Sequence, residues 1–172
     1  MTTAITRPTG AELMECELTH IERVPIDVER ACTQHDDYLD VLRSLRVNIV
    51  ELPRLADNPD AVFVEDTALV LDEVAVLLRP GAESRRGEVA SMAAVLELYR
   101  DCIYMEAPAT LDGGDVIVFG KRILVGETTR SNELGIAALA DLVAPCGYTV
   151  EGVPVHDVLH LKSAATVVDE RR

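Results

Sequence analysis

Hydrophobic residues along the chain follow two spacings, one typical of helices and one typical of strands. In three segments the apolar positions recur every three or four residues, which predicts amphipathic helices. These helices are expected at about 27–46, after Gly87, and between Ser131 and Pro145. Proline and glycine at 145 and 147 are typical of a helix end.

Short runs rich in valine, isoleucine and leucine lie between these helices and predict β-strands. The strands are expected at residues 47–52, 61–71, 74–79, 115–119 and 122–126. The last two are joined by the sequence FGKR at 119–122, which predicts a hairpin turn.

The central part of the chain contains an internal repeat. One segment reads FVEDTALVL, then VAVLLRPGAESRRGE and a helix; the other reads TLDGGDVIVF, then RILVGETTRSNE and a helix. Asp66 precedes Asp112 by 46 positions, and Arg85 precedes Arg130 by 45. A steady offset of this size indicates one supersecondary unit that is used repeatedly.

Both ends of the chain resemble parts of the same unit. Residues 4–12 are similar to residues 77–83, in the second half of a unit, and residues 159–168 are similar to the opening strands. We therefore expect the chain to begin and stop inside repeats. Such an architecture would be left open, because each unit buries its faces against its neighbours.

Charge and composition narrow the class of protein. A net charge of −14 disfavours nucleic acid as a partner, because phosphate binding needs clustered lysine and arginine. No apolar run approaches the roughly 18–20 residues that span a bilayer, and no secretory signal is visible, so no membrane partner and a cytoplasmic location are expected. The four cysteines are widely spaced without a CxxC pair, which favours free thiols over disulfides or a zinc site.

Two acidic clusters occupy equivalent positions in the repeat. One contains Asp60, Glu65 and Asp66, and the other contains Asp112 and Asp115. Any one of them could be a solvent-facing residue at a strand end, but their recurrence favours one convergent acidic pocket. The two glycines between Asp112 and Asp115 give the backbone room for a sharp turn or for close approach to a ligand.

Arginines also recur at equivalent loop positions. Arg85, Arg86 and Arg130 each come shortly before a helix, and a guanidinium fork is well suited to hold a carboxylate. One of the adjacent pair Arg85–Arg86 is expected to be an ordinary solvated side chain. Acidic groups together with arginines suit a zwitterionic ligand that also carries a cationic end.

Two histidines near the C-terminus form the pattern HxxxH. Pro154 and the alternation in VPVHDVLHL predict a strand, where His156 and His160 would lie roughly 13 Å apart. No metal site is therefore expected there. His160 has two open interpretations, a core histidine or a general acid–base at the end of an element.

Five motifs, DAVFVEDTA, RPGAESRRGE, EAPATLDGGDV, GETTRSNE and VLHLKSA, occur in an order and spacing that closely resemble dimethylarginine dimethylaminohydrolase. The resemblance covers essentially the whole chain and implies an α/β fold of the pentein type. This fold is a propeller of ββαβ repeats, of which about three and a half would be present in a single domain, 1–172.

The resemblance also implies the chemistry. Enzymes of this family hydrolyse Nω-methylated arginines to citrulline and a methylamine through a cysteine thiolate and a covalent thiouronium intermediate. His160 would protonate the leaving amine and then activate water, while Asp112 and Asp66 would hold the guanidinium. No metal or organic cofactor is implied.

The remaining implied contacts concern the rest of the substrate. Asp60 and Glu65 would line the same pocket, and Arg85 and Arg130 would clamp the α-carboxylate. Leu18 falls at a lid-loop position whose carbonyl would meet the α-amino group.

The family's nucleophilic cysteine has no counterpart here. None of Cys16, Cys32, Cys102 and Cys146 stands at a matching motif, and the chain stops before the expected position. We therefore expect an N-terminal portion of the enzyme that is inactive alone. The open edges of an incomplete propeller would promote self-association, or a second chain would complete it.

Two other functions stay open. The chain could be an arginine deiminase or amidinotransferase relative, although FVEDTA and HLKS stand where deiminases would carry FTRD-like and HLD-like motifs. It could also be a non-catalytic module that binds arginine-like ligands or a partner subunit.

Overall fold

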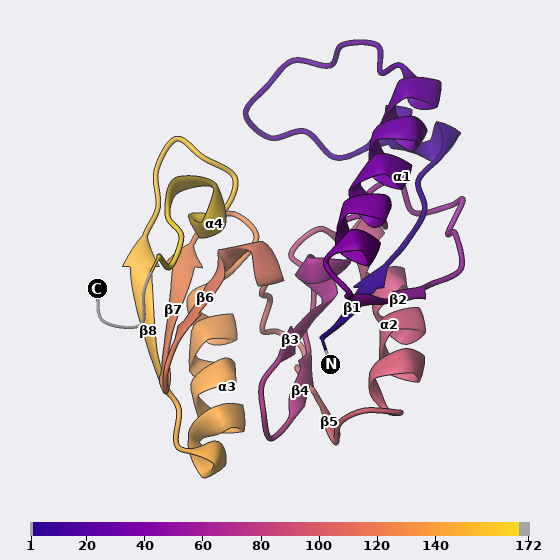
Figure 1. The fold of residues 1–172 in the computed structure, drawn as a ribbon. Coiled ribbons are helices and arrows are strands. Elements are labelled where there is room, and N and C mark those ends of the chain that lie inside the picture. Colours follow the sequence, from indigo (N-terminus) through magenta and orange to yellow (C-terminus); the bar gives the residue numbers. More distant parts are fainter. Residues whose placement is uncertain (1, 169–172) are drawn as a thin grey trace. The chain divides into compact units, whose positions relative to one another are not determined.

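A computed structural model describes residues 2–168 and divides the chain into two compact units, Met1–Val64 and Glu65–Arg172 (Figure 1). The first unit joins two parallel strands through one long helix. β1 (Thr3–Thr6) pairs with β2 (Asn48–Glu51), and α1 (Val28–Ser44) connects them after a short 3-10 helix, η1 (Ala11–Glu15). The predicted first helix is thus confirmed.

The second unit begins with a three-stranded module. Its elements are β3 (Ala68–Val70), β4 (Ala75–Leu77), α2 (Val89–Leu96) and β5 (Cys102–Tyr104). β3 and β4 are antiparallel, and β5 joins the other edge of β4 in parallel after the α2 crossover.

A second module follows with the same order and pairing. It consists of β6 (Val116–Phe119), β7 (Arg122–Glu127), α3 (Glu133–Val143) and β8 (Thr149–Pro154). β6 and β7 are antiparallel, and β7 and β8 are parallel. The predicted internal repeat is therefore confirmed for these two ββαβ modules. The β1–α1–β2 crossover of the first unit corresponds to the second half of such a module.

Short helices connect these elements and carry several of the acidic and arginine side chains that the sequence singles out. They are η2 (Val64–Thr67), η3 (Glu83–Glu88), η4 (Gly113–Asp115), η5 (Ala144–Cys146) and α4 (Leu161–Ala164). Helix η3 follows the end of β4, and helix η4 directly precedes β6.

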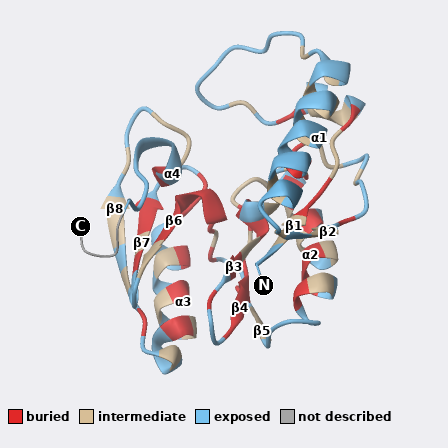
Figure 2. Ribbon diagram, in the orientation of Figure 1, coloured by how far each residue is buried: buried red, intermediate tan, exposed pale blue. Residues whose placement is uncertain are grey.

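The two modules of the second unit share one apolar core. Val76 from β4, Ile123 and Val125 from β7, and Leu139 from α3 are fully shielded from solvent within it. The buried positions follow β4, β7 and one side of α3 in Figure 2. A shared core fixes the loops of both modules relative to each other, which matters because the polar residues lie on those loops.

The hairpin predicted at FGKR is confirmed. Phe119 pairs with Arg122 across a two-residue turn, and Gly120 has a φ of 57°. Two-residue hairpin turns require this left-handed region, which glycine adopts without steric cost. The end of the third helix is confirmed as well, because Gly147 after η5 has a φ of 79°.

Two predicted strands are wrong in part. The run 61–71 is a strand only from Ala68, because residues 64–67 form η2. The strand expected through His156 and His160 ends at Pro154. Asp157 has a φ of 64°, which breaks the alternation, and His160 is the residue before α4. The strands β1 and β5 were not predicted. Among the described residues, no helix is both long and apolar enough to cross a bilayer.

Candidate active site

Asp66 lies on η2 with its carboxylate buried in the second unit. Its Oδ1 accepts a hydrogen bond of 2.8 Å from the backbone amide of Gly114, and its Oδ2 accepts one of 2.5 Å from Arg85 Nη1. Both partners come from loops that follow other strands. The 3-10 turn at 64–67 therefore directs Asp66 inward, where the predicted strand would have left it at a strand end.

Asp112 is fully buried immediately before η4. Its Oδ1 accepts a 2.8 Å hydrogen bond from the backbone amide of Gly81, but its Oδ2 has no hydrogen-bond partner. Arg130 Nη1 lies 3.7 Å from that oxygen. Burial raises the pKa of Asp112, the amide of Gly81 lowers it, and the charge of Asp66 raises it further, so that the net change is upward. A buried carboxylate oxygen without a donor is suited to accept one from a ligand.

His160 stands at the start of α4 between two carboxylates. Its Nε2 lies 3.9 Å from Asp66 Oδ1, and its Nδ1 lies 3.3 Å from Asp115 Oδ1, close enough for an ion pair although the alignment is poor for a hydrogen bond. Burial, the largest influence, lowers the pKa of the imidazole. The contact with Asp115 and the charges of Asp66, Asp115 and Asp112 outweigh burial and raise the pKa above its ordinary value.

The glycines of η4 allow these groups to approach one another. A Cβ atom on Gly114 would lie 2.8 Å from the ring of His160 and 2.9 Å from Asp66 Oδ1. One on Gly113 would lie 2.0 Å from the carbonyl oxygen of Glu65. The glycine pair thus allows the close approach that the sequence predicts, but the neighbours are the ring of His160 and the backbone of Glu65.

Asp66, Asp112 and His160 form a compact cluster in which one oxygen or nitrogen from each lies within 4.8 Å of the others. These atoms have the chemistry to hold a metal ion. The guanidinium groups of Arg85 and Arg130 already lie beside the two carboxylates, however, which opposes a second, doubly charged cation. The cluster suits a singly charged, planar cation that donates hydrogen bonds.

The two arginines predicted for substrate binding differ in their contacts. Arg85 is 3% exposed and donates to Asp66 and, through Nε and Nη2 at 3.1 and 2.9 Å, to the buried carboxylate of Glu88. Burial lowers the pKa of Arg85, but the bonds and charges of Glu88 and Asp66 raise it more. Arg130 lies 3.7 Å from Asp112, a looser pairing, and its backbone amide donates to Thr128 Oγ1.

The other predicted residues lie at the edge of this cluster or in the first unit. Glu65 is paired with Lys162 Nζ at 2.5 Å, and Lys162 also donates to the carbonyl of Gly113 at 3.1 Å. Asp60 belongs to the first unit, where it accepts hydrogen bonds of 3.0 and 3.3 Å from the backbone amide of Glu17. Leu18 follows on the same loop and is half-buried.

Several polar residues around the cluster were not predicted as site residues. Asp115 contacts His160, and Ser131 accepts a hydrogen bond from the amide of Asp112. Glu88 and Lys162 contact neighbouring residues instead, Arg85 and Glu65. The sequence predicts Asp115 only as a member of the acidic cluster that also contains Asp112. The i,i+3 spacing of Arg85 and Glu88 could have indicated their ion pair, had a helical turn been predicted at 83–88.

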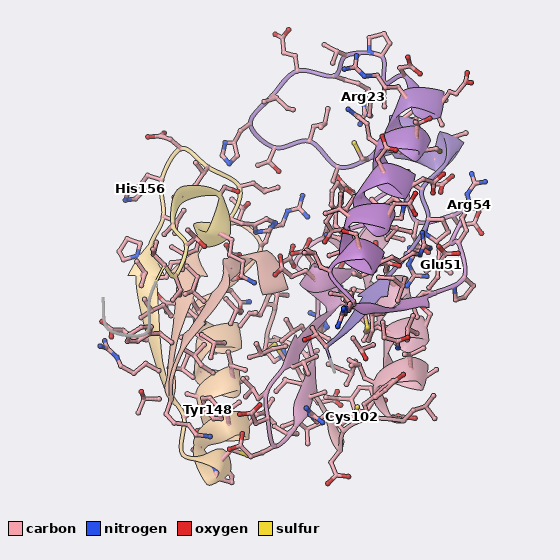
Figure 3. The ribbon with its side chains drawn as sticks, in the orientation of Figure 1. Arg23, Glu51, Arg54, Cys102, Tyr148 and His156 are labelled. Carbon is pink, nitrogen blue, oxygen red and sulfur yellow. The ribbon has the colours of Figure 1, made fainter. Side chains whose placement is uncertain are left out.

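The two cysteines of the second unit lie in environments unsuited to a nucleophile. Cys102 is on β5 (Figure 3), where its Sγ donates to the carbonyl of Arg100. Burial raises the pKa of the Cys102 thiol, and the neighbouring acids Glu97 and Asp101 add to the increase. Cys146 packs against the apolar core. His156, also labelled in Figure 3, is exposed on the loop before α4.

Comparison with known proteins assigns the chain to a family. The family model described as "N,N dimethylarginine dimethylhydrolase, eukaryotic" matches residues 17–165. The chain belongs to the dimethylarginine dimethylaminohydrolase family. It is similar to the N(G),N(G)-dimethylarginine dimethylaminohydrolase of Streptomyces coelicolor, with 41% identity over 168 residues, which is 97% of this chain and 65% of the relative.

Solved structures of dimethylarginine dimethylaminohydrolase share the fold. One from Pseudomonas aeruginosa, a cysteine-to-serine mutant complexed with citrulline, aligns with a TM-score of 0.88 at 32% identity and covers 93% of this chain and 63% of its own. The N-terminal domain of the cyanobacterial arginine dihydrolase ArgZ aligns with a TM-score of 0.71 at 19% identity, over 89% of this chain and 58% of its own, which indicates the fold alone. This chain therefore spans less than two thirds of the length of the dimethylarginine dimethylaminohydrolases that it matches.

Proposed function

We propose that this chain carries the substrate-binding and acid–base half of a dimethylarginine dimethylaminohydrolase. The reaction is hydrolysis of an Nω-methylated arginine to citrulline and a methylamine. The observation that carries the proposal is the buried cluster of Asp66, Asp112 and His160, in which a free carboxylate oxygen and an imidazole meet. This is a site for a guanidinium in a chain that belongs to the family.

In the proposed mechanism the two carboxylates hold the guanidinium in the plane required for attack. Asp112 Oδ2, which has no hydrogen-bond partner among the described residues, accepts a hydrogen bond from an N–H group of the substrate. Asp66 accepts a second N–H beside its bond to Gly114. Fixed orientation of the reacting groups contributes much of the rate of such reactions.

His160 moves the protons. A cysteine thiolate adds to the guanidinium carbon, and the methylated nitrogen leaves as an amine after taking a proton from the imidazolium. Water then adds to the thiouronium carbon while the neutral imidazole accepts its proton. The sulfur leaves as thiolate and citrulline is released. Burial lowers the pKa of His160, but the surrounding carboxylates raise it more, which favours the protonated form that the first step requires.

The remaining residues are assigned to the amino-acid end of the substrate. Arg130 is the better placed of the two proposed carboxylate clamps, because its pairing with Asp112 is long. Arg85 adds positive charge but also holds Asp66 in position. Glu65, Asp60 and Leu18 complete the proposed contacts.

We propose that the nucleophile is none of the four cysteines of this chain. Activation of a thiol requires a lowered pKa, and the pKa of Cys102 is raised instead. Alone, the chain would then bind the substrate without converting it. We also propose that residues 1–172 form one pentein domain with about three and a half ββαβ units. The proposed location of the protein is the cytoplasm.

The exposed edge of such a propeller leads to a proposal about partners. Leu98, Tyr104 and Val70 are large apolar residues that are 78%, 47% and 50% exposed. We expect these surfaces to pair with a second copy or with a completing chain. A compact monomer in sedimentation experiments that does not bind the dye ANS would contradict this expectation.

The function is tested by binding and turnover on the purified chain. Titration calorimetry with Nω,Nω-dimethylarginine should show binding that Asp66→Asn weakens at least about tenfold, as expected for loss of a buried charge-assisted contact. Asp72→Asn, a change of the same charge at an exposed turn, should bind like the wild type. No binding to the wild type, or equal effects of the two variants, would overturn the proposed site.

Citrulline formation separates the proposed mechanism from the alternatives. No citrulline should form from dimethylarginine with the chain alone. Turnover that persists after replacement of all four cysteines by serine would eliminate the cysteine mechanism. Conversion of unmethylated arginine in preference to dimethylarginine would instead favour a deiminase.

A further inference from the structure

Asp115 is a buried carboxylate of the second unit with contacts to several elements. It is fully buried at the end of η4. Its Oδ2 accepts hydrogen bonds from Thr128 Oγ1 at 2.8 Å and Ser131 Oγ at 2.6 Å, both on the loop that follows β7. Two hydroxyl donors on one oxygen fix the carboxylate plane and stabilise its charge.

The other oxygen of Asp115 faces the start of α4. Oδ1 accepts a 3.0 Å hydrogen bond from the backbone amide of Leu161 and lies 3.3 Å from Nδ1 of His160. The carboxylate therefore anchors the backbone beside the histidine and lies next to Nδ1 of the ring. Glycine at 126 makes room for this arrangement, because a Cβ there would lie 3.0 Å from Asp115 Oδ1.

The second ring nitrogen has a different environment. Nε2 faces Asp66, at 3.9 Å, and belongs to the cluster that also contains Asp112. The two carboxylates of that cluster have the guanidinium groups of Arg85 and Arg130 beside them. Asp115 is thus the carboxylate on the far side of the ring from the proposed substrate.

We propose that Asp115 is a positioning residue for His160, which holds the neutral ring as the Nδ1–H tautomer so that Nε2 faces the Asp66–Asp112 cluster. Asp115 itself does not touch the substrate. The tautomer of His160 does not depend on the proposed function. The catalytic consequence, that Nε2 is the nitrogen that exchanges protons with the substrate, does rest on it. Which nitrogen carries the proton is set by the partner of the other nitrogen, as in other histidine–carboxylate pairs.

The tautomer can be measured directly on the wild-type chain. Nitrogen-15 chemical shifts of the imidazole, recorded above the pKa of His160, should show the proton on Nδ1. A proton on Nε2 would overturn the proposal without any need for a variant.

A charge-removing variant tests the role of Asp115 independently. Asp115→Asn preserves the shape of the side chain and should lower the pKa of His160, measured by the same titration, by about half a unit or more. Asp141→Asn on the exposed side of α3 changes the net charge equally and should leave the titration unchanged. Equal titrations of His160 in the two folded variants would overturn the proposal.

The outcomes also distinguish this proposal from the proposed function. If His160 has the Nδ1–H tautomer but Asp66→Asn binds dimethylarginine as the wild type does, the proposed function fails and the positioning role stands. If Asp66→Asn weakens binding but His160 carries its proton on Nε2, the positioning role alone fails.

Discussion

Arg85 Nη1 lies 2.5 Å from Asp66 Oδ2, and both side chains are more than nine-tenths buried. The same guanidinium donates to Glu88, whose side chain is 1% exposed. This guanidinium therefore contacts two buried carboxylates and fixes the position of one of them, Asp66, in the substrate cluster. The pairing couples the stability of the second unit to the geometry of its site.

Removal of the Arg85 side chain should be costly. Arg85→Ala removes the guanidinium that the buried carboxylates of Asp66 and Glu88 share, and loss of one partner of a buried ion pair destabilises a protein by about 3–5 kcal/mol. Urea unfolding followed by circular dichroism measures the change. Arg86→Ala is the matched control, because Arg86 pairs with Glu83, which is 86% exposed, and should cost at most about 1 kcal/mol. Similar losses for the two variants would show that the buried ion pair does not hold the site together.

A methyl group on Gly114 should disrupt the cluster without removing any of its polar groups. The added Cβ of Gly114→Ala would overlap the ring of His160 and approach Asp66 Oδ1 to 2.9 Å. The histidine must move, so the nitrogen-15 shifts of its ring should change and the affinity for dimethylarginine should fall about tenfold or more. Gly120→Asn is the control, since nothing lies within 4 Å of a Cβ there and asparagine tolerates its positive φ. Retention of wild-type affinity by Gly114→Ala would indicate that the site does not depend on this close approach.

The helices and the hairpin could be predicted because their determinants are local. Asp27 caps α1, glycine at 120 turns the hairpin, and glycine at 147 ends the segment after α3. The repeat offset alone relates equivalent positions, and the two modules have the same topology. These features need only neighbours in sequence, or the comparison of one segment with another.

The site needed contacts that sequence spacing does not reveal. The alternating run around Asp66 is typical of a strand, yet η2 forms there with the carboxylate bonded to Gly114, 48 positions later. The start of α4 likewise depends on a bond from Leu161 to Asp115, 46 positions earlier. Long-range hydrogen bonds to buried carboxylates outweighed the local strand pattern in both places.

The two capped helices differ in how much their caps should contribute. Asn132 Oδ1 accepts from the amides of Gly135 at 2.7 Å and Thr110 at 3.1 Å, while Asp27 accepts from the amide of Arg30, at 3.0 Å on the surface. Asn132→Ala should therefore cost about 2 kcal/mol and Asp27→Ala about 1 kcal/mol or less. Urea unfolding of the two variants checks the order, and a larger loss for Asp27→Ala would contradict it.

Stability should depend on pH through His160. The pKa of this group is raised in the folded protein, because Asp115, Asp66 and Asp112 outweigh the effect of burial. The folded state then binds the proton more tightly than the unfolded state. The stabilisation is complete below the ordinary pKa of about 6.5 and is lost as the pH rises through the raised value.

His160→Gln should remove this part of the pH dependence. The free energy of unfolding of the wild type should fall from pH 6 to pH 8 more steeply than that of the variant, measured by urea unfolding at several pH values. His156→Gln is the matched control, because His156 is exposed on the same loop and its loss should leave the wild-type slope. A rise in wild-type stability over this range would mean that burial dominates over the three carboxylates. The imidazole would then be neutral at pH 7 and unable to protonate the leaving amine in the first step of the proposed reaction.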